Sequence, residues 1–219
     1  MASSQRLREY HSPRRDEQAR RTRERIIAAA SERFLESGYA ATTMPRIAGA
    51  AGVAVQTVEL AFGTKRDLLK AVIDVAIAGD HEPIPILDRP SATAAQSTTH
   101  VGEFLAIVGQ IVASVADRVA GLLTVMSEAA RTDPEIAALA RQLDAQRATM
   151  AAAIVNGIAE RARLRSSLSY EEAVDTIWLL MDPFIFRRLT RDRAWTVERF
   201  QRWFSDSAQR LLADTRDDR

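Results

Sequence analysis

Residues 43–65 read TMPRIAGAAGVAVQTVELAFGTK, and the architecture of the chain can be inferred outward from them. Their apolar positions allow two short helices, expected at 44–51 and 55–61, to pack across a tight turn. Gly52 lies at that turn, where the backbone needs a positive φ angle. Ala48 is small, as the first helix requires where the second crosses over it. The apolar residues expected to form the contact are Ile47, Ala48, Ala51, Val53 and Val58.

This helix pair has two interpretations. An ordinary helical hairpin inside a core has the same apolar pattern. Helices of about two turns are poor core elements, however, because they have little intrinsic stability. A helix-turn-helix of this kind, braced by a preceding helix, can instead lay its second helix in the major groove of DNA. We therefore favour the DNA-binding interpretation.

The flanking sequence predicts a helix on each side of the pair. Apolar residues that recur at every fourth position indicate a helix over 16–37, which Gly38 should end. Thr64 is expected to cap a further helix that runs to Gly79. Two helices, one on each side, thus support the pair and the turn between its members.

A larger helical part is expected after residue 79. Residues 79–97 contain three prolines and should form a loop. Five longer helices are expected beyond it, at 99–115, 117–131, 134–163, 169–190 and 196–213. No β-alternation of useful length is present, so the sequence predicts an all-α fold of about nine helices.

The composition excludes several classes of function. The chain has no cysteine, which excludes disulfides, thiolate nucleophiles and cysteine-based zinc sites. Its three histidines are scattered, and no catalytic motif is visible. We therefore expect no enzyme activity, no metal and no cofactor. The start of the sequence lacks an apolar core and the apolar runs look too short to cross a bilayer, so a cytoplasmic location is expected.

The charge is distributed unevenly along the chain. Residues 1–66 hold twelve Lys and Arg against seven Asp and Glu, a net +5, which leaves −4 for the rest of a chain of net charge +1. A basic end on a mildly acidic body suggests that the first segment meets a polyanion. For residues 1–15 alone, a solvated, disordered basic arm is an equally good interpretation.

The stretch and its flanks also resemble a known family. Residues 20–70 are similar, with unbroken spacing, to the N-terminal domain of the tetracycline-repressor-type (TetR) regulators. The matching pieces are Ile26–Ala30, Phe34, Gly38-Tyr39, Thr42-Thr43, Ile47-Ala48, Ala51–Val53, Thr57-Val58, Phe62, Thr64-Lys65 and Asp67–Leu69. The resemblance implies a dimer that binds double-stranded DNA, with a small-molecule site in the rest of the chain.

DNA contacts are implied along residues 42–65. The predicted DNA-binding residues are Thr42, Thr43, Arg46, Val55, Gln56, Thr57, Glu59 and Lys65. Gln56 is the best base reader, because its amide can pair bidentately with adenine. Thr43 and Lys65 each lie at a helix start, where a phosphate is favoured. The arginines within residues 14–21 either reach phosphates and an adjacent minor groove or are simply solvated.

Glu59 and Pro45 depart from the family pattern. The family usually has Tyr at the position of Glu59, and a carboxylate near phosphates costs Coulomb energy and offers no hydrogen-bond donor. The Glu59→Tyr variant is therefore expected to bind DNA more tightly, unless Glu59 reads a cytosine amino group, in which case binding loosens. Pro45 stands where the family often has a charged residue, and proline is tolerated in a first helical turn.

The resemblance further implies that the last two helices pair with those of a second subunit. The predicted dimerisation residues are Trp178, Ile185, Phe200, Trp203, Phe204 and Leu211. Both helices carry more large apolar side chains than one packing face requires, which is compatible with a dimer. Burial of these side chains within one subunit is the alternative.

A ligand cavity enclosed by the central helices is implied in the same way. The predicted ligand-binding residues are His100, Leu122, Met126, Trp178, Met181, Asp182 and Phe184. Asp182 is unusual, because it stands among apolar side chains beside Pro183, which should kink its helix. It either anchors a ligand, reaches solvent, or pairs with Arg187 or Arg188.

These expectations combine into one functional hypothesis. The chain should divide into a disordered basic arm (1–15), a helix-turn-helix DNA-binding domain (16–63) and a ligand-binding and dimerisation domain (64–219). The expected function is that of a ligand-responsive transcriptional regulator, a repressor, which binds a palindromic operator as a homodimer and is released by an unidentified small-molecule effector. The alternative is a helical ligand-binding or scaffold dimer with weak or lost DNA binding.

Overall fold

A computed structural model describes residues 13–82 and 84–214. Within these two ranges the secondary structure is helical, apart from an isolated bridge between Leu164 and Ala213. The predicted all-α fold is confirmed. Residues 1–12 of the predicted basic arm lie outside the described residues, and residues 13–15 already belong to the first helix.

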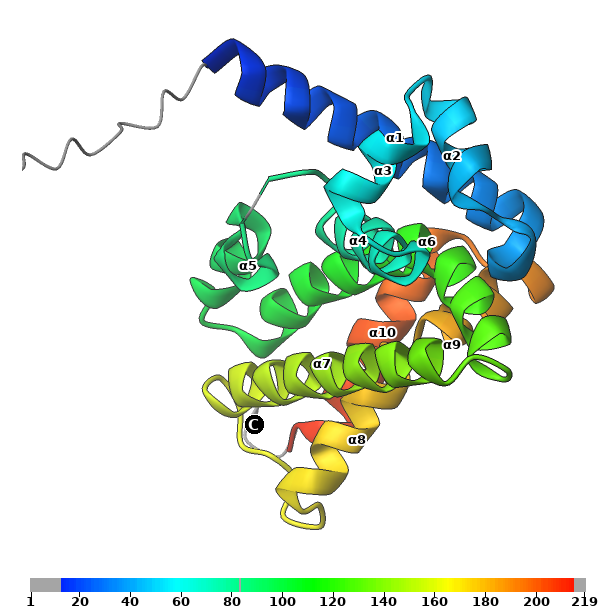
Figure 1. Ribbon diagram of the computed structural model, residues 1–219. Coiled ribbons are helices and arrows are strands. Elements are labelled where there is room, and N and C mark those ends of the chain that lie inside the picture. Colours follow the sequence, from blue (N-terminus) through cyan, green and yellow to red (C-terminus); the bar gives the residue numbers. More distant parts are fainter. Residues whose placement is uncertain (1–12, 83, 215–219) are drawn as a thin grey trace, which may run out of the picture.

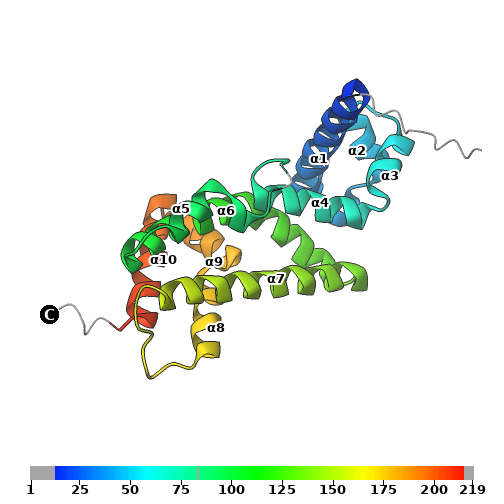
Figure 2. The same cartoon turned by 90° about the vertical axis from the view of Figure 1, so that its left-hand side faces the viewer.

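The helices form an elongated molecule. Figure 2 shows α1, α2 and α3 at one end and α8 and α10 toward the other, with α4, α6 and α7 between them. The elements, in chain order, are α1 (Pro13–Ala41), α2 (Met44–Ala51), α3 (Val55–Phe62), α4 (Lys65–Ala78), the 3₁₀ turn η1 (Ile86–Asp88), α5 (Pro90–Gln96), α6 (Val101–Ala130), α7 (Pro134–Ala159), α8 (Tyr170–Leu180), α9 (Pro183–Arg187), the π-helical turn η2 (Arg188–Asp192) and α10 (Val197–Leu212).

Local signals define α2 and the turn that follows it. The Thr43 hydroxyl accepts a hydrogen bond from the Arg46 N–H at 3.4 Å and so caps α2, with Pro45 in the first turn. Gly52 closes the helix in the left-handed conformation (φ 64°, ψ 41°), and its N–H donates to the carbonyls of Ala48 and Gly49. The predicted bounds of α2 are therefore confirmed.

The first helix is interrupted where the sequence predicts its end. Gly38 has φ 74° and ψ 173°, a backbone conformation that other residues rarely adopt, and one further helical turn follows it to Ala41. Thr42 then closes this corner, because its buried hydroxyl donates to the carbonyl oxygens of Gly38 (2.7 Å) and Arg33 (3.0 Å). The chain direction into α2 is thereby set by one glycine and one hydroxyl.

Two hydrophobic cores share the long helices α6 and α7. The first contains buried side chains of α1 to α4 together with the C-terminal part of α6 and the N-terminal part of α7. The second contains the other ends of α6 and α7 together with α5, α8, α9 and α10. The domain division at residue 63 stays a prediction, since the first core includes buried residues on both sides of it, such as Val58 and Leu68.

The structure corrects three predicted helix boundaries in this region. Residues 99–131 do not form two helices, because nothing interrupts the chain near Ala116 and α6 is continuous. The predicted loop at 79–97 contains α5, which begins with Pro90 in its first turn. The predicted helix at 169–190 is divided, because Pro183 starts α9 after a break at Met181-Asp182.

Helix α6 is more apolar than the sequence inspection suggested. Among the described helices it alone is long and apolar enough to cross a membrane by length and composition, with a mean hydropathy of 1.5 over its most apolar window, half of which is buried. It contributes side chains to both cores. Its hydropathy therefore reflects the role of a central packing helix.

Candidate functional site

One face of helix α3, its exposed stripe, carries both polar and apolar side chains that point to solvent. Val58 and Phe62 are buried and fix its rotation against the first core. Gln56, Glu59 and Leu60, spaced i, i+3 and i+4, are all exposed, and Leu60 is 91% exposed. Sequence inspection missed Leu60, although its position one turn after Gln56 placed it on the same face.

Two cationic side chains act as clamps near the C-terminal end of α3, one on that helix end and one on the corner between α1 and α2. The Arg23 guanidinium of α1 lies over the Phe62 ring at 4.2 Å and donates to the Ala61 carbonyl at 3.1 Å. Beyond the C-terminal end of α3, the Lys65 ammonium donates to the carbonyls of Tyr39 (2.8 Å) and Thr42 (3.0 Å). Helix α2 packs on α1, and α3 contacts both α2 and α4; Figure 1 shows these four helices close together.

The surroundings of Lys65 differ from the prediction of a free cation. Its ammonium lies over the Tyr39 ring at 4.1 Å, and burial lowers the pKa of Lys65 from its ordinary value. Two of the three N–H groups that an ammonium carries already bond within the domain. The side chain therefore closes the end of α1, and a contact with a DNA phosphate stays a prediction.

The predicted DNA-binding residues are not equally accessible. Thr43, Arg46, Gln56 and Glu59 are exposed, whereas Val55, Thr57 and Lys65 are half-buried. Thr42 is only 1% exposed and its hydroxyl bonds inward, which corrects its prediction as a DNA contact. Arg46 remains at the surface, with one guanidinium nitrogen donating to the Ala41 carbonyl at 3.2 Å.

The basic start of α1 is partly neutralised by its own acids. Glu17 accepts from Arg20 at 2.8 Å and from Arg21 at 2.7 Å, and these bonds lower the pKa of the Glu17 carboxyl. Arg14 and Arg15 are exposed. Pairs as exposed as these contribute little stability, so the arginines can exchange partners readily.

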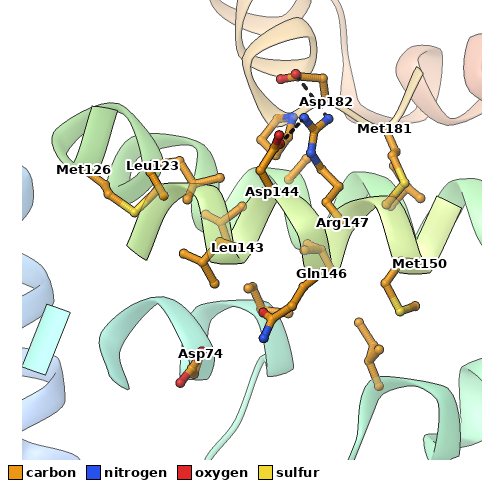
Figure 3. A pocket seen from close by; sticks show the side chains of 18 of the residues that line it. Asp74, Leu123, Met126, Leu143, Asp144, Gln146, Arg147, Met150, Met181 and Asp182 are labelled. Atoms are coloured by element: carbon orange, nitrogen blue, oxygen red, sulfur yellow. Dashed lines mark hydrogen bonds and ion pairs between the residues drawn. The ribbon is translucent and has the colours of Figure 1, made fainter. Parts of the chain in front are cut away.

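A cavity of about 900 Å³ lies between α4, α6 and α7. Its α6 wall is almost wholly apolar, and methionines of three segments line it: Met126, Met150 and Met181. Most of its polar side chains come from α7 and from the break before α9 (Figure 3). A volume of this size accommodates a drug-sized molecule, and methionines adapt to varied apolar shapes.

An arginine on α7 organises the polar wall of this cavity. Arg147 pairs with Asp144 at 2.7 Å and with Asp182 at 3.2 Å, as Figure 3 shows. Its guanidinium also stacks on the Trp178 ring at 3.9 Å and donates to the Trp178 carbonyl, near the broken end of α8. The expected partners of Asp182, Arg187 and Arg188, are thus corrected to Arg147.

Four of the predicted ligand-binding residues line the cavity: Met126, Met181, Asp182 and Phe184. The other three do not. Leu122 is buried in the first core while its neighbour Leu123 faces the cavity, Trp178 packs behind Arg147, and His100 is exposed at the start of α6. Sequence inspection missed Arg147, because two of its partners, Trp178 and Asp182, lie outside its own helix.

The predicted dimerisation residues fall into two groups. Phe200 and Phe204 are fully buried in the second core, where the Phe200 ring meets Phe186 at 4.9 Å, which corrects their prediction as interface side chains. Trp178, Ile185 and Trp203 are half-buried, and Leu211 is 48% exposed. Leu179 on α8, which the sequence analysis did not select, is 51% exposed.

The helix-turn-helix region matches a family profile. Residues 26–72 match the bacterial regulatory proteins of the tetR family, from the middle of α1 into α4. No curated protein matches the chain. The tetR family and the solved structures below are transcriptional regulators and not enzymes.

Solved structures share the fold over nearly the whole chain. A SmeT–triclosan complex has a TM-score of 0.69 at 17% identity, over 90% of this chain and 93% of that one. A putative TetR-family regulator from Mesorhizobium loti has a TM-score of 0.63 at 17% identity, over 90% and 98%. A putative transcriptional regulator from Saccharomonospora viridis, in complex with choline, has 0.63 at 14% identity, over 89% and 99%. At these identities the likeness is one of fold.

Proposed function

We propose that the chain is a ligand-responsive transcriptional repressor, because residues 26–72 match the tetR family of bacterial regulatory proteins. In this proposal a homodimer binds a palindromic DNA operator through two copies of α3. A small-molecule effector bound in the cavity then releases the operator. The observation that carries the proposal is the exposed stripe of α3, which has Gln56 at its start and is fixed by the burial of Val58 and Phe62 and by the bond from Arg23 at its C-terminal end.

The clamps matter because a base-reading helix must keep its orientation. Arg23 and Lys65 each bond to backbone carbonyls outside their own helices. The helix is therefore held by bonds as well as by the packing of Val58 and Phe62. Such rigidity favours a hydrogen bond from the Gln56 amide to a base edge, since little conformational entropy remains to be lost on binding.

Dimerisation supplies the second copy of α3. Large apolar side chains are exposed on α8 and α10, among them Leu179 and Leu211. These helices lie toward the end of the molecule away from α2 and α3 (Figure 2). A two-fold axis at that end leaves both helix-turn-helix units free to meet successive turns of one DNA duplex.

Helix α4 provides the path from effector to DNA. Asp74, Ile77 and Ala78 in its C-terminal half line the cavity, while Lys65 at its N-terminus holds the corner between α1 and α2. A molecule that displaces the C-terminal half of α4 therefore also moves the support of α2. The proposal divides the chain into a DNA-binding part (16–63) and a ligand-binding and dimerisation part (64–219).

The lining of the cavity favours an effector that is mainly apolar. Asp74 is paired with Lys70 at 2.6 Å, and both Asp144 and Asp182 are paired with Arg147. Arg141 also lines the cavity, so the three carboxylates are balanced only when Lys70, Arg141 and Arg147 are counted together, and the lining as a whole offers no net charge to attract an ion. The SmeT complex holds triclosan and the Saccharomonospora viridis regulator holds choline, so regulators of this fold bind small molecules of different polarity.

The proposal is tested by fluorescence anisotropy on labelled DNA taken from upstream of the chain's own gene. We expect specific binding that weakens steeply with salt, because a protein that neutralises DNA phosphates releases their counterions. The Gln56→Ala variant should bind about tenfold more weakly, since one bidentate base contact is lost. Absence of any specific binding, at low salt and with competitor DNA present, would overturn the proposal.

One observation favours the alternative of a helical ligand-binding or scaffold dimer. Among the described residues, the Glu59 carboxylate on the exposed face of α3 has no hydrogen-bond or ion-pair partner. Unpaired, it repels phosphates. A dimer in solution that shows neither salt-dependent nor sequence-dependent DNA binding would establish this alternative.

A further inference from the structure

We propose that Glu59 and Leu60 set the base sequence of the operator. Glu59 accepts a hydrogen bond from the N4 amino group of a cytosine, and Leu60 packs on the C5-methyl group of a thymine. This inference rests on the proposed function, because it takes α3 to lie in the major groove. It extends that function by assigning the chemical groups that the two side chains recognise.

The orientation of both side chains follows from the packing of α3. Val58 is fully buried and Phe62 is 9% exposed beneath the Arg23 guanidinium, so the helix cannot rotate about its axis. Glu59 and Leu60 then face solvent together with Gln56. If the Gln56 amide enters a groove of the DNA, the Glu59 carboxylate and the Leu60 side chain must enter the same groove.

The carboxylate lacks compensation within the domain. Three cationic side chains of the helix-turn-helix region bond to backbone carbonyls and not to Glu59: Arg23 to Ala61, Arg46 to Ala41, and Lys65 to Tyr39 and Thr42. When α3 lies in the major groove, the DNA phosphates therefore repel the Glu59 carboxylate, and a hydrogen bond from a base offsets that repulsion. Its oxygens accept hydrogen bonds and donate none, which excludes contacts with guanine N7 and O6.

Two bases offer an amino group in the major groove, and cytosine is the better match. The adenine amino group lies beside N7, an acceptor that repels a carboxylate. The cytosine N4 amino group has no acceptor of its own base beside it in the groove. A carboxylate on α3 thus selects cytosine and disfavours the other three bases.

Leu60 requires an apolar partner. With 91% of its surface exposed and no polar atom in its side chain, it gains free energy in the groove only from apolar contact. The thymine methyl is the apolar group that base pairs display there. Glu59 and Leu60 are consecutive in α3, so their side chains point about 100° apart around the helix axis. The two side chains therefore read different base pairs.

The experiment selects binding sites from a randomised duplex library with the full chain. We expect the unsubstituted protein to enrich a palindrome with a cytosine and a separate thymine in each half-site. Glu59→Gln should lose the cytosine preference, by about tenfold in relative affinity, while its binding to random DNA strengthens because a repulsive charge is removed. Leu60→Ala should lose the thymine preference and keep the cytosine preference.

A base analogue isolates the methyl contact. Replacing that thymine by deoxyuridine removes only the methyl group, and should weaken binding of the unsubstituted protein about fourfold. The Leu60→Ala variant should not distinguish the two duplexes. Glu32→Gln, which removes an exposed carboxylate from α1, is the matched control and should keep every base preference.

The outcomes separate the inference from the proposed function. If the unsubstituted protein enriches no sequence, the proposed function fails. If it enriches a palindrome whose preferences are identical in Glu59→Gln and Leu60→Ala, the proposed function stands and the inference is overturned. A uniform gain in affinity of Glu59→Gln, without a change in base preference, would show that Glu59 is only repulsive and would likewise overturn it.

Discussion

Single polar side chains donate hydrogen bonds to carbonyl groups at helix ends, and several of these helix ends lie far from the side chain in the sequence. Arg118 of α6 donates to the carbonyls of Ala76 (2.7 Å) and Ile77 (3.0 Å) at the end of α4. Arg161, in the turn after α7, donates to the carbonyls at the end of α5, and Arg147 of α7 donates to the last turn of α8. Each satisfies acceptors that a helix end leaves without an intrahelical partner. Thr42 does the same at the corner after α1.

Thr42 provides the first prediction at this scale. Thr42→Val keeps the shape of the side chain but removes the hydroxyl that donates to Arg33 and Gly38, so two carbonyls at a buried site lose a donor. We expect the free energy of unfolding to fall by about 1–2 kcal/mol, measured by urea denaturation. Thr42→Ser keeps the hydroxyl and should lose less. A valine variant as stable as the unsubstituted protein would show that the hydroxyl is not structural.

Asp80 provides a pH-dependent prediction. Hydrogen bonds from the Arg89 guanidinium, and secondly from the Glu82 N–H, lower the pKa of Asp80 to about 2. Because the folded pKa is depressed, the contribution of the pair is fully present above the ordinary pKa of 3.8 and is lost as the pH falls toward about 2. A carbon-13 NMR titration should therefore place the midpoint of the Asp80 carboxyl near 2.

The Arg89→Gln variant is the control for that titration. Without the guanidinium, the midpoint of Asp80 should move back toward 3.8. The same midpoint in both proteins would contradict the ion pair. The pair spans the segment that carries Pro85 and Ile86 along the cavity, so its loss should also loosen that wall.

At the scale of elements, α6 and α10 approach closely because one residue has no side chain. A Cβ atom built on Gly109 would lie 2.7 Å from the Ser205 hydroxyl and 3.0 Å from the Gln201 carbonyl oxygen. The Ser205 hydroxyl in turn lies 2.8 Å from the carbonyl of Leu105 and donates toward it. The two helices are therefore held by a backbone contact that a larger residue would push apart.

This contact predicts a position-specific cost of alanine in α6. Gly109→Ala should reduce the free energy of unfolding by about 1–3 kcal/mol, because the methyl group overpacks the contact with α10. Gly102→Ala on the same helix is the matched control, since its Cβ would meet only the Gln209 side chain at 3.7 Å. That variant should gain up to about 1 kcal/mol from helix propensity. Equal effects of the two substitutions in thermal and urea unfolding would refute the close approach.

At the scale of the whole molecule, the two hydrophobic cores are joined by the same two long helices. Helices α6 and α7 contribute side chains to both, and α4 joins the cavity to the helix-turn-helix unit. The proposed response to an effector is thus a displacement of α4 against a rigid frame. The exposed apolar surface of α8 and α10 lies on the other side of that frame, where a partner subunit can be held without obstructing α3.

Dimerisation is the prediction that belongs to this scale. Leu179→Glu and Leu211→Glu each place a charge on the proposed interface, where it would be buried without a partner. Both should shift the molar mass measured by light scattering from that of a dimer to about 24 kDa. Leu87→Glu introduces the same charge at a residue that is 43% exposed in η1, and should remain dimeric. Dimers from all three variants would place the interface elsewhere.

Helix ends and turns could be predicted from the sequence where the residues that cause them lie within one helical turn. The bounds of α2, the left-handed Gly52, the Asp133-Pro134 start of α7 and the Ser169–Glu172 capping box all depend on residues within one helical turn. The continuity of α6 was missed, since no breaker separates its halves and only packing against both cores shows its length. The start of α5 was missed because Pro90 begins a helix as readily as it ends one.

The amino-acid order by itself determined the all-α architecture, the helix-turn-helix unit and the place of Gln56 in its second helix, because periodicity, caps and turn glycines act through neighbours in the chain. Only the tertiary structure decided which polar groups remain free. Thr42 and Lys65 turn inward, and Arg147 captures Asp182 from another helix, because a hydrogen bond or an ion pair depends on distance in space. The 91% exposure of Leu60 likewise became evident only once the burial of Val58 and Phe62 had fixed the rotation of α3.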